Sequence, residues 1–115
     1  MIFVFGSNLA GRHGAGAAKH AVQYYGAQYG VSAGITGQAY AIPTKDAQLR
    51  TLSIDEITKH AKIFVDYAVS DDRNFLLTPI GTGLAGHSKK DIWDMFVELE
   101  IPDNVFLSSS WMTIL

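Results

Sequence analysis

Two glycine-rich loops constrain the fold of this chain more than any other feature of its sequence. Each loop follows an apolar run typical of a strand and precedes a segment with helical periodicity. The loops are Gly11-Arg12-His13-Gly14-Ala15-Gly16 and Gly81-Thr82-Gly83-Leu84-Ala85-Gly86. Glycine lets backbone N–H groups approach an anion that a side chain would otherwise block. Two such loops, each between a strand and a helix, therefore predict one phosphate-bearing ligand that is held from both sides.

The remaining pattern continues this alternation of strands and helices. Apolar runs predict strands at residues 2–5, 38–42, 75–79 and 105–107. Apolar residues at helical spacing predict three helices: one from Gly14 to a stop at Gly26, one behind a capping box at residues 53–56, and one from a Ser88 cap to near Pro102. Residues 27–37 are expected to be a loop or a short irregular strand.

This order of elements predicts a mostly parallel sheet with right-handed crossovers and helices on both faces, a three-layer α/β/α fold of minimal size. In such sheets a ligand binds at the carboxyl ends of the strands, where the strand order reverses. A spatial order 2-1-3-4 of the four strands makes residues 2–5 and 75–79 neighbours. Both glycine loops then flank one crevice.

The length and composition limit the classes of protein to which this chain can belong. A chain of 115 residues is expected to form one domain, residues 1–115. The content of 48% hydrophobic and 17% charged residues is typical of a globular protein, and a net charge of −2 argues against broad attraction to nucleic acid. The sequence has no cysteine, no apolar run long enough to span a bilayer and no basic leader before the first strand. We therefore expect a cytoplasmic protein without disulfides, thiolate metal sites or a membrane partner.

Polar residues gather in the first loop. The presence of Asn8, Arg12 and His13 there favours ligand binding over the alternative that the glycines serve only a tight turn and close helix packing. Asn8 can bind a ribose hydroxyl or close a local Asx turn, and both interpretations stay open. The second loop can wrap a diphosphate or a distal ribose. His87 follows it directly, and a histidine without a partner is more often a surface residue than a catalyst.

Other residue types lack the spacing that a metal site or a serine nucleophile requires. The histidines at positions 13, 20, 60 and 87 lack zinc-ligand spacing, so no metal is expected. Ser108-Ser109-Ser110 lacks the glycine frame of a serine-hydrolase nucleophile. Trp93 can stack on a base, although its neighbours Ile92 and Phe96 favour packing in the core or at its rim. The tail, residues 111–115, is too apolar to be a free solvated end, and we expect it to add an edge strand or to cover a partner.

These motifs resemble the macrodomain family, whose members bind ADP-ribose, and most of all its branch that removes ADP-ribose from glutamate. The matching segments are Gly14-Ala15-Gly16, Ile42-Pro43-Thr44-Lys45 and Pro79-Ile80-Gly81-Thr82-Gly83-Leu84. The likeness covers nearly the whole chain in order and spacing. The chain also resembles small uncharacterised proteins often encoded by bacteriophages, for which the compartment is the host cytoplasm.

The resemblance implies that the first loop cradles the diphosphate and that the second encloses the distal ribose. Together with the loop residues it gives the expected ligand-binding set: Gly6, Ser7, Asn8, Arg12, Gly14, Ala15, Gly16, Ile80, Gly81, Thr82, Gly83, Leu84 and Gly86.

Three positions depart from the hydrolytic patterns of that family. Ala85 stands where the deacylating branch has an aspartate, and the catalytic lysine of that branch falls near Val22 or Gln23. Gly16 stands roughly where other hydrolytic members have an acidic residue. The family's extra strand and adenine-recognising acidic residue precede the first strand, and we expect no counterpart of them here, so the resemblance does not imply adenine selectivity.

Three functions follow as hypotheses. The first is a module that binds ADP-ribose or a related nucleotide-diphosphate metabolite as a reader or sequestering protein, without a cofactor. The second is a hydrolase of ADP-ribose esters, ADP-ribosylated substrates or ADP-ribose phosphate, in which His13 acts as acid and base, Asn8 positions water, and Lys19 or His87 supports them. The third is a structural or host-interaction factor that acts through the tail. A homodimer through an edge strand or the tail is also expected.

Overall fold

The computed structural model describes the backbone of residues 1–114 and the side chains of residues 1–112. A five-stranded sheet has the order β2-β3-β1-β4-β5, and only β2 runs antiparallel to its neighbour. The elements along the chain are β1 (Ile2–Asn8), α1 (Gly16–Tyr25), β2 (Gly34–Thr36), β3 (Ala39–Lys45), α2 (Ile54–Val69), β4 (Phe75–Leu77), α3 (Lys89–Leu99), β5 (Val105–Leu107) and the 3₁₀ helix η1 (Ser109–Ile114). The four expected strands lie in the expected spatial order.

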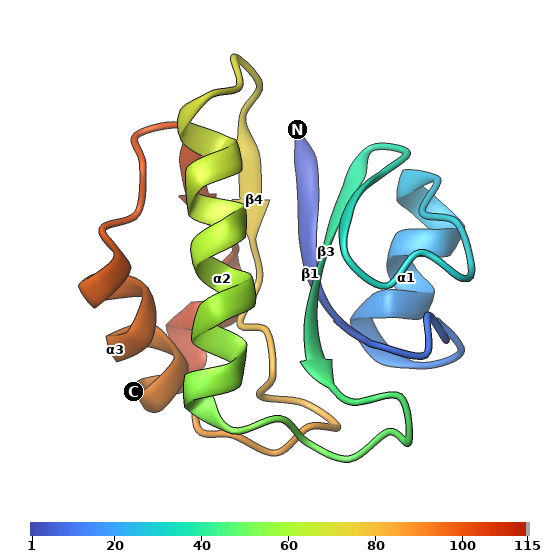
Figure 1. Ribbon diagram of the computed structural model, residues 1–115. Helices are drawn as coiled ribbons and strands as arrows, with labels where there is room; N and C mark the ends of the chain where they lie inside the picture. Colours follow the sequence, from blue (N-terminus) through green and yellow to red (C-terminus); the bar gives the residue numbers. More distant parts are fainter. Residues whose placement is uncertain (115) are drawn as a thin grey trace.

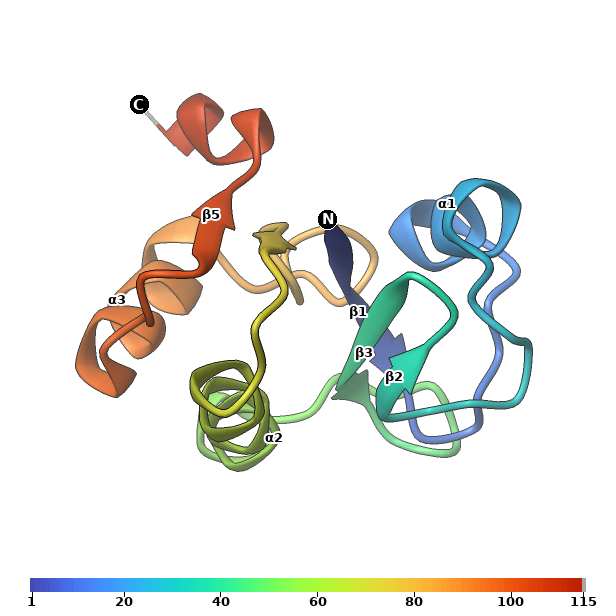
Figure 2. The same ribbon diagram turned by 90° about the horizontal axis from the view of Figure 1, so that it is seen from above.

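Helices cover both faces of this sheet and form a three-layer α/β/α fold, as the order of elements predicts. Helix α1 lies on one face, and α2 and α3 lie on the other (Figure 1, Figure 2). The α2 and α3 side holds the larger core cluster, with Phe64, Phe75 and Phe96 fully buried. The α1 side holds a smaller cluster, in which the alanines of α1 and β3 let the helix approach Phe3 and Phe5 closely.

Local sequence signals begin and end the helices. Ser53 and Glu56 form the reciprocal hydrogen bonds of a capping box at the start of α2. The Ser88 hydroxyl accepts from the backbone N–H of Asp91 at the start of α3. Gly26 ends α1 in the left-handed conformation, with φ 71°. The expected positions of the three helices are therefore confirmed to within a few residues.

The segment at residues 27–37 contains the short strand β2, which makes a hairpin with β3 and extends the sheet by one antiparallel edge strand. The opposite edge is β5, where Phe106 is half exposed. Dimerisation through an edge strand stays a prediction.

The tail forms η1 rather than the expected edge strand. Trp111 is buried, its indole N–H donates to the carbonyl of Leu77 at 2.8 Å, and its ring meets the Trp93 ring edge-on. This contact corrects the edge-strand prediction, because the apolar side chain of Trp111 is used to close this chain's own core. It also places Trp93 in packing rather than in base stacking. Leu115 lies outside the described residues.

None of the helices formed by residues 1–114 combines the length and the apolar character that crossing a bilayer requires.

Candidate functional site

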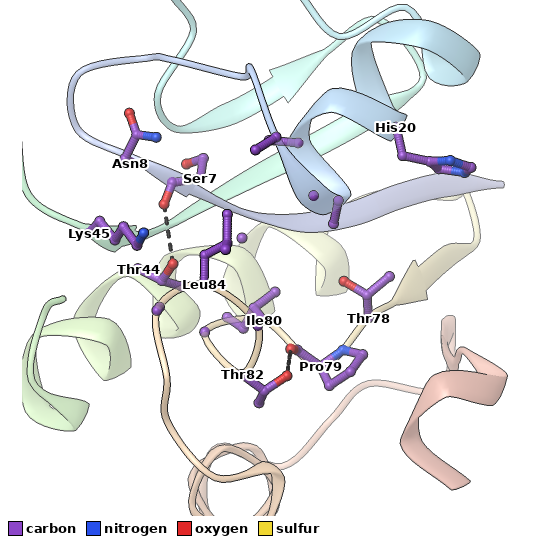
Figure 3. Close-up of a pocket in the computed structure, with 18 of the residues that line it drawn as sticks. Ser7, Asn8, His20, Thr44, Lys45, Thr78, Pro79, Ile80, Thr82 and Leu84 are labelled. Carbon is purple, nitrogen blue, oxygen red and sulfur yellow. Dashed lines mark hydrogen bonds between the residues drawn. The ribbon is translucent and has the colours of Figure 1, made fainter. Parts of the chain in front are cut away.

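A cavity of about 940 Å³ lies at the carboxyl ends of β1, β3 and β4, and both glycine loops contribute to its wall. Figure 3 shows Asn8 and Lys45 at one end, His20 and Thr78 at the other, and Leu84 between them. The lining residues are Phe3, Gly6, Ser7, Asn8, Arg12, Gly14, Ala15, Gly16, Ala17, Ala18, His20, Tyr29, Thr44, Lys45, Leu49, Thr78, Pro79, Ile80, Gly81, Thr82, Gly83, Leu84, Ala85, Ser108 and Ser110.

The first loop leaves the N-terminus of α1 open toward this cavity. Ala15 occupies the N-cap position with extended backbone angles, and it has no side chain that caps the helix. The first turn also contains no acidic residue. Because the first N–H groups of a helix have no intrahelical acceptor, an uncapped terminus in a cavity wall offers donors and a positive dipole end to an anion.

The second loop is folded by its own hydrogen bonds and is held from outside. The Thr82 hydroxyl donates to the Pro79 carbonyl at 2.6 Å, and the Thr51 hydroxyl donates to the Ala85 carbonyl at 2.7 Å. Gly81 has φ 72°, which favours glycine. These contacts anchor both sides of the loop and leave Leu84 at its tip, 74% exposed.

The second loop lies close to β1 at Gly6. A Cβ at Gly6 would lie 3.3 Å from the backbone nitrogen of Gly81, tighter than nine in ten Cβ contacts in proteins. A side chain at Gly6 would therefore require the second loop to move by a few tenths of an ångström, which would alter the cavity wall.

The cavity is a cationic site in an acidic chain. Arg12 and Lys45 line it, whereas none of the described lining residues is Asp or Glu. Within residues 1–114, no ion pair ties Arg12 or Lys45 to a carboxylate. All 11 acidic residues lie between Asp46 and Asp103. Residues 1–45, which build most of the wall, therefore contain basic but no acidic side chains. The site is thus suited to an anionic ligand.

Nearly all of the expected ligand-binding residues line this cavity. Gly86 is the exception, since it does not line the cavity, and its backbone N–H donates to the Gly83 carbonyl at 3.1 Å. Asn8 lines the cavity, and its side-chain amide also closes its own loop by bonding to the backbone of Arg12. The turn is therefore confirmed, and binding of a ribose hydroxyl by Asn8 stays a prediction.

The three candidate catalytic residues do not line the cavity. His13 is buried, its Nε2 bonds the Val31 carbonyl at 2.9 Å, and its Nδ1 has no hydrogen-bond partner. The Nε2 of His87 bonds the Leu52 carbonyl at 2.8 Å, and Lys19 is exposed on α1. The two histidines thus anchor loops.

Sequence reasoning missed several polar residues of the wall, above all Lys45, His20, Thr78, Ser108 and Ser110. Lys45 was within reach of sequence analysis, because it ends the strand that Pro43 and Thr44 belong to, and strand ends are where ligands bind in parallel sheets. The absence of acidic residues before Asp46 was a second visible signal. Within the described part of the chain, no group of three metal-ligating side chains gathers.

Comparison with known proteins supports the fold and goes no further. No protein-family model matches the chain, and no curated protein does either. A solved structure of a protein of unknown function from Bacteroides thetaiotaomicron is similar, with a TM-score of 0.64 and 14% sequence identity. The similarity covers 93% of this chain and 88% of that one.

Proposed function

We propose that this protein binds ADP-ribose or a related nucleoside-diphosphate sugar, in the manner of a minimal macrodomain. The observation that carries the proposal is the convergence of two glycine loops on one cavity beside an uncapped helix N-terminus. Backbone donors at that terminus and on the second loop suit a diphosphate, which needs many N–H groups and little specific side-chain chemistry.

The charge distribution supports the same ligand class. Arg12 and Lys45 supply positive charge to the cavity wall, and the protein as a whole is acidic. A discrete diphosphate fits this arrangement better than a long polyanion, which would meet the acidic remainder of the surface.

At the positions that carry catalytic residues in hydrolytic macrodomains, the residues of this chain favour ligand binding without cleavage. Gly16 and Ala85 line the cavity but have no group that can transfer a proton or attack a bond. Val22 packs against the cluster between α1 and the sheet and does not line the cavity. We therefore infer a reader or sequestering module as the main function.

Calorimetric titration with ADP-ribose tests this proposal. We expect saturable binding of one ligand per chain, and the absence of heat at millimolar ligand would contradict the proposal. A leucine at Gly14 should abolish binding while leaving the fold intact, since a Cβ there meets no atom within 4 Å and the longer side chain takes space from the cavity. Gly83→Leu provides a second variant on the other loop, also in open space. Ala33→Leu, at an exposed position away from the wall, is the matched control.

A hydrolase is the second candidate, and Lys45 is the observation that favours it. Its primary amine is half-buried at the cavity wall, where an amine can act as a nucleophile toward a carbonyl carbon or as an electrostatic stabiliser. Release of ADP-ribose from modified protein substrates, followed over time, tests this candidate. Turnover should be lost in Lys45→Ala and Lys45→Arg, whereas a purely electrostatic role would let arginine retain part of it.

A further inference from the structure

We infer that Leu49 contacts an uncharged ring of the bound ligand, and that its backbone is held in a strained conformation to place it there. Leu49 lies in the turn between β3 and α2, outside both glycine loops, and it lines the cavity. The inference rests on the proposed function, because the contact is with the ligand of the same cavity.

The turn that contains Leu49 is a three-residue hairpin loop. Lys45 and Thr51 form an antiparallel bridge at its base. The Asp46 backbone N–H donates to the Arg50 carbonyl at 2.8 Å, and the Asp46 carbonyl accepts from the Leu49 N–H at 3.0 Å. In hairpin loops with this pattern of bonds, the last loop residue takes the left-handed conformation and is usually glycine. The local fold therefore favours glycine at position 49.

The backbone at Leu49 is strained, because this residue occupies the left-handed conformation with φ 64°. A bulky side chain is unfavourable there, since its Cβ approaches a carbonyl oxygen. Among the described residues other than glycine, Glu100 alone shares a positive φ, and it ends α3, where a left-handed residue closes the helix. Leu49 ends no helix. Strain of this kind is retained mainly at sites where a function requires the residue.

Packing within the protein does not account for the leucine. Its side chain is 41% exposed and belongs to neither core cluster of the described residues. The turn itself is well anchored, because the Asp46 carboxylate accepts from two backbone N–H groups of the turn at 2.9 Å each. The Thr51 hydroxyl also ties the base of the turn to the Ala85 carbonyl of the second loop. Leu49 is thus fixed in the cavity wall with part of its apolar surface uncovered.

The chemistry of leucine limits which part of the ligand it contacts. An alkyl side chain neither donates nor accepts a hydrogen bond, so it offers nothing to a phosphate, which needs donors. It stabilises a complex by covering the C–H face of an uncharged ring and removing that face from water. A nucleoside-diphosphate sugar presents such a face in two places, the nucleoside and the terminal sugar.

Calorimetric titration of variants of the full chain tests the contact. Leu49→Gly and Leu49→Ala should each weaken ADP-ribose binding by at least fivefold, because both remove the apolar side chain. Leu49→Met keeps an apolar side chain of similar reach and should bind within twofold of the unmodified protein. ADP lacks the terminal ribose: a loss with ADP-ribose alone assigns the contact to that sugar, and an equal loss with ADP assigns it to the nucleoside.

The failure of this inference differs from the failure of the proposed function. Unchanged affinity in both Leu49→Gly and Leu49→Ala overturns the contact and leaves the proposed function standing. If the unmodified protein does not bind ADP-ribose, the proposed function fails and this inference fails with it.

Urea denaturation of the same variants tests the strain. Leu49→Gly should have a higher urea midpoint than Leu49→Ala, because glycine adopts the left-handed conformation without the Cβ contact that strains alanine. Ala47→Gly is the matched control in the same turn, at an exposed position that does not line the cavity and has no positive φ. It should lower the midpoint and leave the affinity unchanged, since glycine there only adds freedom to the unfolded chain. A lower midpoint for Leu49→Gly than for Leu49→Ala would mean that position 49 is not strained and would overturn the inference.

Discussion

Asn8 and Arg12 exchange two hydrogen bonds that close the first glycine loop. The Asn8 side-chain amide donates to the Arg12 carbonyl at 2.8 Å, and its oxygen accepts from the Arg12 backbone N–H at 3.0 Å. The side chain thus bridges the turn that follows β1, and this turn leads the chain toward the N-terminus of α1. Because the same loop forms part of the cavity wall, this pair links the stability of the loop to the shape of the site.

Asn8→Ala should therefore destabilise the protein by about 1–2 kcal/mol, the sum expected for two partly solvated hydrogen bonds, and should weaken ligand binding. Urea denaturation and calorimetry measure the two effects. Asn8→Asp keeps the acceptor and loses the donor, so it should fall between the alanine variant and the unmodified protein in stability. Equal stability of the alanine variant and the unmodified protein would show that the two bonds do not hold the loop.

Lys45 should contribute to ligand affinity more than to stability. Its side chain lines the cavity, and within residues 1–114 it has no ion-pair partner to lose. Lys45→Met should weaken ADP-ribose binding by roughly tenfold, as expected for a charge-assisted contact to phosphate, and should reduce the salt dependence of the dissociation constant. Lys59→Met, at an exposed position on α2, should change neither. A salt dependence that is unchanged in Lys45→Met would argue against contact between this ammonium and the ligand.

The elements that the sequence predicts well are those specified by neighbouring residues. The capping box at Ser53 and Glu56 marks the start of α2 without knowledge of any distant contact, and Gly26 ends α1 in the same local way. The strand order follows from the alternation of elements and the handedness of crossovers. The glycine loops were visible for the same reason, because each contains two glycines with the positive φ that favours this residue: Gly11, Gly16, Gly81 and Gly86.

The parts that escaped prediction depend on contacts between distant segments. Strand β2 exists because three residues pair with β3, and the tail becomes η1 because Trp111 finds the Leu77 carbonyl and the Trp93 ring. His20 lines the cavity only because α1 crosses the sheet beside Phe3. His13 is the reverse case, a residue that the sequence suggested for the site and that does not line the cavity. A histidine in a loop resembles a catalyst until its burial and its bond to Val31 are known.

Tyr40 should make stability sensitive to alkaline pH. Burial raises the pKa of its phenol above the ordinary value of 10.0, and the nearby Tyr67 adds to the effect. The folded state therefore favours the neutral phenol, so this contribution to stability is complete below about pH 10 and is lost as pH rises through the folded-state pKa. The free energy of unfolding, measured by urea titration across that range, should fall less steeply in Tyr40→Phe. Tyr24→Phe, at a position that is 71% exposed, should leave the slope unchanged.

Alanine substitution of Gly37 and of Gly34 can distinguish the cost of backbone strain from the cost of steric contact in the β2–β3 hairpin. Both have positive φ, 59° and 89°, so alanine is strained at either position. A Cβ at Gly37 would lie 2.3 Å from the carbonyl oxygen of Gly26, whereas a Cβ at Gly34 meets nothing within 4 Å. Gly34→Ala should therefore cost about 1 kcal/mol, and Gly37→Ala should cost a further 1–3 kcal/mol because the hairpin must move away from the end of α1. Urea denaturation of the two variants measures the difference. Equal losses would mean that the hairpin yields freely and that its contact with Gly26 does not hold α1 on the sheet.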